Sequence, residues 1–120
     1  MRPTQLAPPD CASILDLGPE RAVLAGGRAV VTVGRRDTPV LIVRTRKGIF
    51  AVEDRCPHAG FSLADGAARR RSIRCSRHGR EYDLVSGACR THPRSRPART
   101  YPAWVDPSGH VLVAVPDEAD

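Results

Sequence analysis

Two short segments of this 120-residue sequence each contain one cysteine, one histidine and a closing glycine: Cys56-Pro57-His58-Ala59-Gly60 and Cys75-Ser76-Arg77-His78-Gly79. Structural zinc sites more often take a cysteine pair from one turn and a second ligand pair from another. One thiolate and one imidazole in each segment instead favour two metals, as in a [2Fe-2S] cluster in which two histidines replace two cysteines on one iron. The sequence therefore predicts that these four side chains are metal ligands, with a Cys2His2 zinc module as a remote alternative.

The two segments and their spacing resemble the Rieske iron-sulfur proteins, and the resemblance continues through Tyr82-Asp83 to roughly the whole chain after residue 10. It implies an all-β fold, a Rieske-like antiparallel β base domain with a small inserted cluster-binding subdomain. It also implies a Rieske-type [2Fe-2S] cluster with a reduction potential of about −150 to +300 mV. The ligands implied for its two irons are Cys56, His58, Cys75 and His78.

Residues beside these ligands are expected to tune the cluster. Tyr82 matches the family tyrosine whose hydroxyl bonds a ligating sulfur, although a strand tyrosine also commonly fills a core. Gly60 and Gly79 allow the backbone to approach the inorganic sulfides. Arg80 stands where respiratory Rieske proteins place a serine, and the missing hydroxyl argues for a potential toward the low end of the range.

Respiratory Rieske proteins also carry an extra cysteine in each loop, joined as a disulfide, whereas residues 59–61 and 76–77 contain none. The chain is therefore more similar to the soluble ferredoxins of multicomponent oxygenases. That resemblance implies an electron carrier without catalytic residues of its own, with a flavin-dependent reductase and a terminal oxygenase as partners. The alternative is the small subunit of a nitrite reductase or of another oxidoreductase complex.

Length and composition favour a single domain. A chain of 120 residues can bury one core, and we expect one Rieske-like domain over residues 11–120 after a flexible N-terminal arm at 1–10. The cluster-binding insert should cover about residues 54–92 and should depend on bound metal for its order. The apolar runs have only strand length and the N-terminus lacks an apolar signal region, so a cytoplasmic protein without a membrane partner is expected.

The formal net charge of +6 raises the question of a nucleic-acid partner. Aromatic residues make up only 4% of the chain and no nucleic-acid motif is present, so platforms for base stacking are missing and we expect no such binding. Arg69 to Arg71, Arg74, Arg77 and Arg80 instead predict a positive collar around the cluster loops that attracts an acidic redox partner. A solvated basic face is the plainer interpretation of the same residues.

Alternating and β-branched residues predict an antiparallel meander early in the chain and a hairpin at its end. A first strand over 12–17 should be followed by a turn at 18–20 and a connection over 21–27. One helical turn fits residues 62–68. The remaining strands are expected over residues 29–33, 39–44, 49–53, 72–74, 82–85, 99–105 and 110–115.

Several residues with metal-binding chemistry have no ligand partner at a useful spacing. They are Cys11, Cys89, His92 and His110. Free cysteine commonly packs as a small hydrophobic side chain, so packing or surface roles are expected for all four residues.

Overall fold

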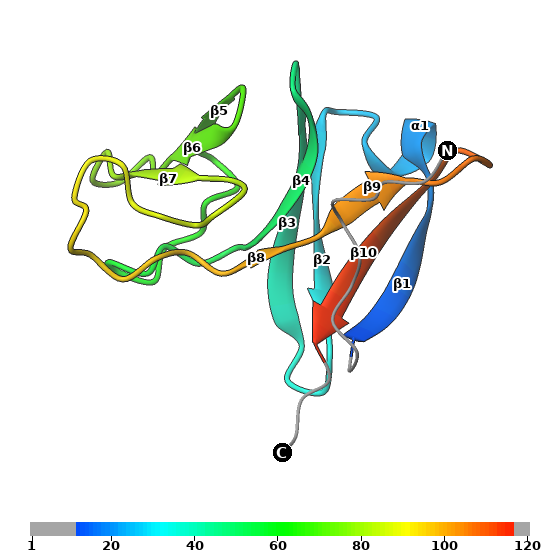
Figure 1. The fold of residues 1–120 in the computed structure, drawn as a ribbon, viewed down its shortest axis with the longest axis horizontal. Helices are drawn as coiled ribbons and strands as arrows, with labels where there is room; N and C mark the ends of the chain where they lie inside the picture. The colour runs from blue at the N-terminus through cyan, green and yellow to red at the C-terminus, as the bar shows by residue number, and fades with distance from the viewer. Residues whose placement is uncertain (1–11, 117–120) are drawn as a thin grey trace.

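The computed structural model describes residues 12–116, and this part of the chain is almost entirely antiparallel β-structure, as expected. The predicted arm at 1–10 and Cys11 lie outside the described residues. Figure 1 shows a larger lobe, here called the base, and a small lobe formed by residues 54–99. The elements are β1 (Ala12–Pro19), α1 (Glu20–Val23), β2 (Arg28–Val33), β3 (Thr38–Thr45), β4 (Gly48–Glu53), β5 (Ala67–Arg69), β6 (Ser72–Arg74), β7 (Glu81–Asp83), β8 (Thr100–Tyr101), β9 (Ala103–Val105) and β10 (His110–Pro116).

The base contains two sheets, with strand orders β1-β10-β9 and β2-β3-β4-β8. β2, β3 and β4 follow one another as the predicted meander, because β2 pairs with β3 and β3 pairs with β4 in continuous antiparallel register. The core between the two sheets is formed by buried side chains of both sheets and by Leu24, which follows α1. Its members include Leu24, Val40, Ile42, Val111 and Val113.

Strand β3 is buried on both faces, because successive side chains of a strand point in opposite directions. Val40 and Ile42 enter the core of the base, whereas Leu41 and Val43 belong to a second core. This second core is completed from the small lobe, and it places that lobe against β3 and β4. The contributing residues of the small lobe are Cys56, Leu63, Ile73, Cys75, Tyr82, Leu84, Cys89 and Ala98.

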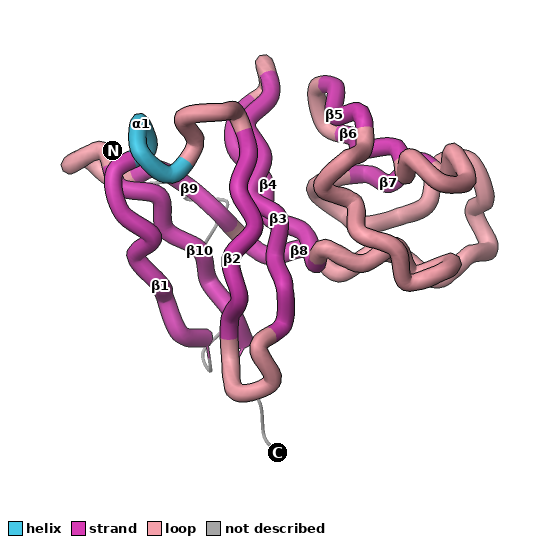
Figure 2. The backbone as a smooth tube through the Cα atoms, turned by 180° about the vertical axis from the view of Figure 1, so that it is seen from behind, coloured by secondary structure: helices cyan, strands magenta, loops and turns pink. Residues whose placement is uncertain are grey.

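The small lobe contains a three-stranded sheet with the order β5-β6-β7, and Figure 2 shows its long connecting loops from behind. Hydrogen bonds fasten this lobe to the base in addition to the shared core. Nη1 of Arg28, on β2, donates to the carbonyl oxygens of Ala64 and Gly66 at 2.6 and 2.8 Å. The hydroxyl of Thr45, at the end of β3, donates to the carbonyl oxygen of Arg70.

The prediction of a turn at 18–20 is wrong, because strand β1 continues through Gly18 to Pro19. A bulge between Asp16 and Gly18 lets the strand stay paired with β10 as far as Pro19↔His110. The chain then forms the single helical turn α1 where a plain connection was expected. Among residues 12–116, no helix has the length and apolar content needed to cross a bilayer.

Two further expectations are corrected. Residues 62–68 form no helical turn, because Ala67–Arg69 pair with β6 as the short strand β5. The last hairpin also differs, since the strand expected over 99–105 is divided at Pro102. β8 joins β4 in one sheet of the base, and β9 joins β10 in the other.

The Arg28 contacts predict a measurable contribution to stability. Replacing Arg28 by Met removes the hydrogen-bond donor to two carbonyl oxygens. We expect the free energy of unfolding to fall by about 1–3 kcal/mol. Urea unfolding followed by circular dichroism measures this loss. Arg35→Met, in the exposed β2–β3 turn, is the matched control, and equal unfolding curves for the two variants would contradict the role of Arg28.

Candidate metal centre

The two Cys-His segments fold into loops with the same backbone hydrogen bonds. In the first loop, the Cys56 amide donates to the Phe61 carbonyl at 2.7 Å and the Gly60 amide donates to the Cys56 carbonyl at 2.7 Å. In the second loop, the Cys75 amide donates to the Arg80 carbonyl at 2.8 Å and the Gly79 amide donates to the Cys75 carbonyl at 2.9 Å. Each loop is therefore closed on its own cysteine.

The closing glycine of each loop has a left-handed backbone. The φ angle is 79° at Gly60 and 74° at Gly79, a conformation that costs glycine little and other residues more. This explains why each Cys-His segment ends in glycine. A residue with a side chain at either position would strain the turn that directs its cysteine inward.

The loops bring like donors together. Cys56 and Cys75 are 0% and 1% exposed, and their thiols are close enough to hydrogen bond with each other. His58 and His78 are exposed at the loop tips, where their ring centroids are 4.9 Å apart and their planes meet at 85°. No group of three or more Cys, His, Asp or Glu side chains within residues 12–116 has the arrangement of a single-ion site.

The Cys56 sulfur is surrounded by hydrogen-bond donors. The Tyr82 hydroxyl lies 3.4 Å from it, and the amides of His58 and Ala59 also bond to it. Burial alone raises the pKa of Cys56, but these hydrogen bonds outweigh burial and lower the pKa below its ordinary value, which favours the thiolate. Burial, followed by the neighbouring Cys56, raises the pKa of Tyr82, so its hydroxyl keeps the proton that it donates.

The first loop is also held by Asp54, which the sequence analysis did not single out. Its carboxylate accepts hydrogen bonds from the Ser62 hydroxyl at 2.8 and 2.9 Å and from the Leu63 amide at 2.7 Å. These bonds tie the residues after the loop to the residue two positions before Cys56. An aspartate just before the first cysteine, with a serine after the loop, is the sequence signal for this clamp.

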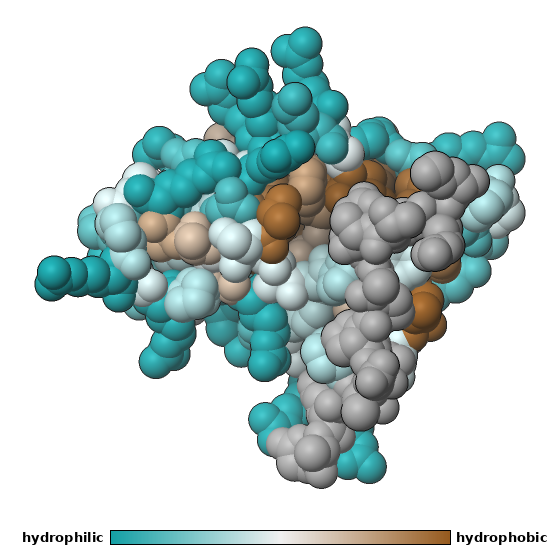
Figure 3. Space-filling model, in the orientation of Figure 1, coloured by the Kyte–Doolittle hydropathy of each residue, from teal (hydrophilic) through white to brown (hydrophobic). Residues whose placement is uncertain are grey.

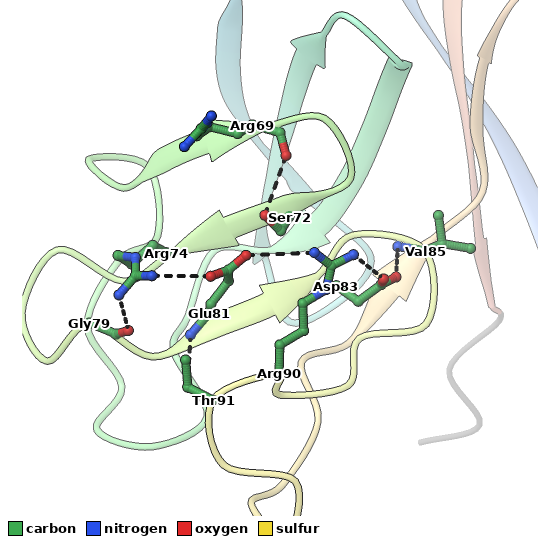
Figure 4. A network of polar contacts seen from close by, with 9 residues as sticks. All are labelled: Arg69, Ser72, Arg74, Gly79, Glu81, Asp83, Val85, Arg90 and Thr91. Carbon is green, nitrogen blue, oxygen red and sulfur yellow. Dashed lines mark hydrogen bonds and ion pairs between the residues drawn. The ribbon is translucent and has the colours of Figure 1, made fainter.

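An alternating chain of charges holds the second loop (Figure 4). Arg74 donates to the Gly79 carbonyl at 3.0 Å and pairs with Glu81 at 3.1 Å. Arg90 then lies between Glu81, at 3.6 Å, and Asp83, at 2.7 Å. Arg74 is therefore occupied in fixing the loop and is not a free charge of the predicted collar.

The remaining arginines of the predicted collar have different positions. Arg77 lies over the Phe61 ring, with Cζ 4.3 Å from the ring centroid, and so joins the second loop to the first. Arg80 donates to the Ser95 hydroxyl. Partial desolvation and then the nearby Arg80 charge lower the pKa of His58. Arg77 and Arg80 thus lie beside the imidazoles.

The Arg69–Arg71 triplet lies elsewhere, which corrects its predicted place in the collar. Arg69 pairs with Ser72 at the turn end of the β5–β6 hairpin, whereas Cys75 follows the other end of β6. The carbonyl of Arg70 is bonded by Thr45 of the base. The triplet therefore lies at the turn end of the β5–β6 hairpin, and the cluster loop that begins at Cys75 follows the other end of β6.

The cysteine and histidines outside the two loops that the structure describes have structural contacts. Cys89 is buried in the second core, with its sulfur 3.5 Å from the Thr91 hydroxyl. His110 bonds Asp16 at 2.9 Å across β1 and β10. His92 is exposed and bonds the Thr91 hydroxyl at 3.0 Å. These positions agree with the packing and surface roles expected from the sequence.

This donor set fits a binuclear iron-sulfur cluster. Two adjacent buried sulfurs, one of them prone to ionise, suit one iron, and two adjacent exposed imidazoles suit the other. A family model describing the Rieske [2Fe-2S] domain matches residues 15–102. The chain belongs to the Rieske [2Fe-2S] family. Its cofactor is the Rieske-type [2Fe-2S] cluster that defines this family. The alternative of a zinc module is therefore excluded.

The chain is similar to Rieske ferredoxins and spans less than two thirds of the length of several curated relatives that it matches. It is 31% identical over 70 residues to the ferredoxin subunit of 3-phenylpropionate/cinnamic acid dioxygenase from Photorhabdus laumondii, a match that spans 58% of this chain and 66% of that subunit. The Sphingomonas yanoikuyae B1 ferredoxin structure has a TM-score of 0.69 and 25% identity, with 87% of this chain and 100% of the ferredoxin covered.

A further solved structure shares the fold. The small subunit of an NADH-dependent nitrite reductase from Mycobacterium tuberculosis superposes with a TM-score of 0.75 at 23% identity. The superposition covers 88% of this chain and 97% of the subunit. Carrier proteins and a reductase subunit thus have the same Rieske architecture.

The Tyr82 hydrogen bond predicts a shift of the reduction potential. A donor to a ligand sulfur stabilises the more negative, reduced state, so Tyr82→Phe should lower the potential by roughly 20–60 mV, equivalent to one hydrogen bond of about 0.5–1.5 kcal/mol. Protein-film voltammetry measures the shift. Tyr101→Phe, in the core of the base, is the control, and an equal potential in both variants would exclude the Tyr82 effect.

Proposed function

We propose that this Rieske protein is a one-electron carrier, with Cys56, His58, Cys75 and His78 as the ligands of its cluster. The observation that supports this function best is the separation of the donors by depth. The cysteines are buried under the loops, whereas the histidines are exposed at the tips. A partner can therefore approach the imidazole side while the thiolate side stays shielded from water.

The side chains around the site support the carrier role in distinct ways. When bound, the cluster accepts and releases one electron at a time. Tyr82 and the loop amides donate hydrogen bonds to the Cys56 sulfur, while Asp54 and Arg74 hold the two loops in place. These contacts position the ligands and the loops that carry them. The site is thus suited to transferring electrons.

The partners belong to the same proposal. A flavin-dependent reductase would supply the electron and a terminal oxygenase would receive it in the cytoplasm, as the likeness to a dioxygenase ferredoxin subunit suggests. Arg77 and Arg80 beside the imidazoles favour an acidic docking face on either partner. A role as the small subunit of a nitrite reductase is the second candidate, favoured by the structural likeness to such a subunit.

The ligand assignment predicts which cysteines the chromophore requires. Aerobically purified protein should be coloured and, once reduced, should show the EPR spectrum of a Rieske cluster. Cys56→Ser and Cys75→Ser should each lose colour and EPR signal, because a cluster requires its thiolate ligands. Cys89→Ser is the matched control, since Cys89 is a buried cysteine outside the loops, and it should keep both. A chromophore retained in Cys56→Ser or Cys75→Ser would refute the ligand set.

The charges at the loop tips predict a preference among small oxidants. Anionic ferricyanide should oxidise the reduced protein faster than cationic hexaamminecobalt(III) after correction for driving force, and the ratio should fall about two- to fivefold between about 0.05 and 0.5 M salt. Stopped-flow absorbance measures both rates. Arg77→Gln should reduce the ratio, whereas the distant Arg35→Gln should not. A ratio independent of salt would argue against electrostatic steering.

A further inference from the structure

A groove lies between the small lobe and the base, on the face seen in Figure 3. Its volume is 910 Å³, and its walls come from the β3–β4 hairpin, the end of β7 and the β8–β9 segment. Apolar side chains form much of the lining, among them Ile49, Phe50, Val85, Trp104 and Val105. Val85 and Val105 are 60% and 36% exposed, which is unusual for valine and leaves apolar surface uncovered.

The rim of the groove is strongly basic. Arg46, Lys47 and Arg71 line it, and no ion pair to them is formed within residues 12–116. The acidic residue in the lining is Glu20, which is already paired with Arg44 at 3.1 Å. An apolar floor under unpaired positive charges complements a ligand that is both apolar and acidic.

The groove is well separated from the candidate metal centre. Arg71 precedes β6 and Cys75 follows it, so the two residues lie about 13 Å apart along an extended strand. Leu84 and Val85, in the groove wall, likewise follow β7 at the end opposite to Arg80. A molecule seated in the groove would leave the histidine tips free.

The groove also exposes the edge of a strand. β4 pairs with β8 only at Ala51 and Val52, because Pro102 divides the last part of the chain and sends β9 into the other sheet. Residues 48–50 of β4 therefore face the groove without a paired strand on that side within the described chain. Unpaired strand edges accept extended peptides, whose alternate side chains can enter apolar pockets.

We propose that this groove is a second docking site, which binds an extended, acidic and apolar segment of a partner protein. The peptide lies along the outer edge of β4, its apolar side chains cover Val85, Trp104 and Val105, and its carboxylates pair with Arg46, Lys47 and Arg71. This site gives a role to Arg71, which lies at the end of β6 opposite to the cluster loops. A partner held here can stay attached while the loop tips exchange electrons.

Trp104 is the only tryptophan of the chain and lies in the groove wall, so its fluorescence reports on occupancy. The probe is a short synthetic peptide in which Glu alternates with Phe and Val, added to the holoprotein at low salt. We expect a saturable change in Trp104 fluorescence, and binding at least about tenfold weaker for the same peptide with Lys in place of Glu. Raising the salt to about 0.5 M should reduce this difference.

Variants locate the binding. The double variant Arg46→Glu/Lys47→Glu changes two exposed turn residues, and it should bind the acidic peptide about tenfold more weakly or worse. Arg35→Glu/Arg36→Glu, in the opposite β2–β3 turn, is the matched charge control and should bind normally. The visible spectrum should not change in the groove variant, and the oxidation rate by ferricyanide at about 0.5 M salt, where charges are screened, should change little. These readouts keep the test separate from the carrier function.

Three results would overturn the proposal. The first is the absence of a saturable signal with the acidic peptide up to about 1 mM, because a dissociation constant above that concentration means that no specific site exists. The second is equal binding of the acidic and basic peptides. The third is self-association of the protein that Arg46→Glu/Lys47→Glu abolishes, measured by analytical ultracentrifugation, since the groove would then belong to a second copy of the chain.

Discussion

Burial of β3 on both faces is the constraint on which the structure depends. Val40 to Val43 are all apolar and 0–1% exposed, so the strand needs a cover on each side. Each fully buried side chain of this kind is worth about 1.5–3 kcal/mol relative to exposure, which makes an uncovered face costly. The second sheet of the base covers one face. The small lobe covers the other, and the metal site is built into that cover.

The site must shield its thiolates and also expose a path for the electron. The folding of each loop back onto its own cysteine allows both. A thiolate is stabilised by nearby donors and must be kept from oxidants, whereas an electron can leave only through a part of the protein that a partner can reach. Hydrogen bonds from the loop amides to Cys56 satisfy the first demand. The imidazoles at the loop tips satisfy the second. Arg77 over Phe61 then links the two loops without a covalent bond.

The donor types and the main strands could be predicted from the sequence because both are local signals. Cys56 and His58 are two residues apart, and β3 contains a continuous apolar run from Val40 to Val43. The errors arise where tertiary contacts decide. Ala67–Arg69 become a strand only because β6 pairs with them, and the same hairpin brings the Arg70 carbonyl to the Thr45 hydroxyl. The role of Asp54 has no local signal, because its partners Ser62 and Leu63 lie on the far side of a loop.

The two ends of the small lobe leave the base side by side. β4 runs into the lobe and β8 runs out of it, with Ala51 opposite Tyr101 and the Glu53 amide bonded to the Arg99 carbonyl at 2.8 Å. A segment that starts and finishes at one neck can lengthen or shorten without moving the strands beneath it. Evolution can therefore reshape the metal-bearing lobe for new partners while the same β-framework is inherited unchanged.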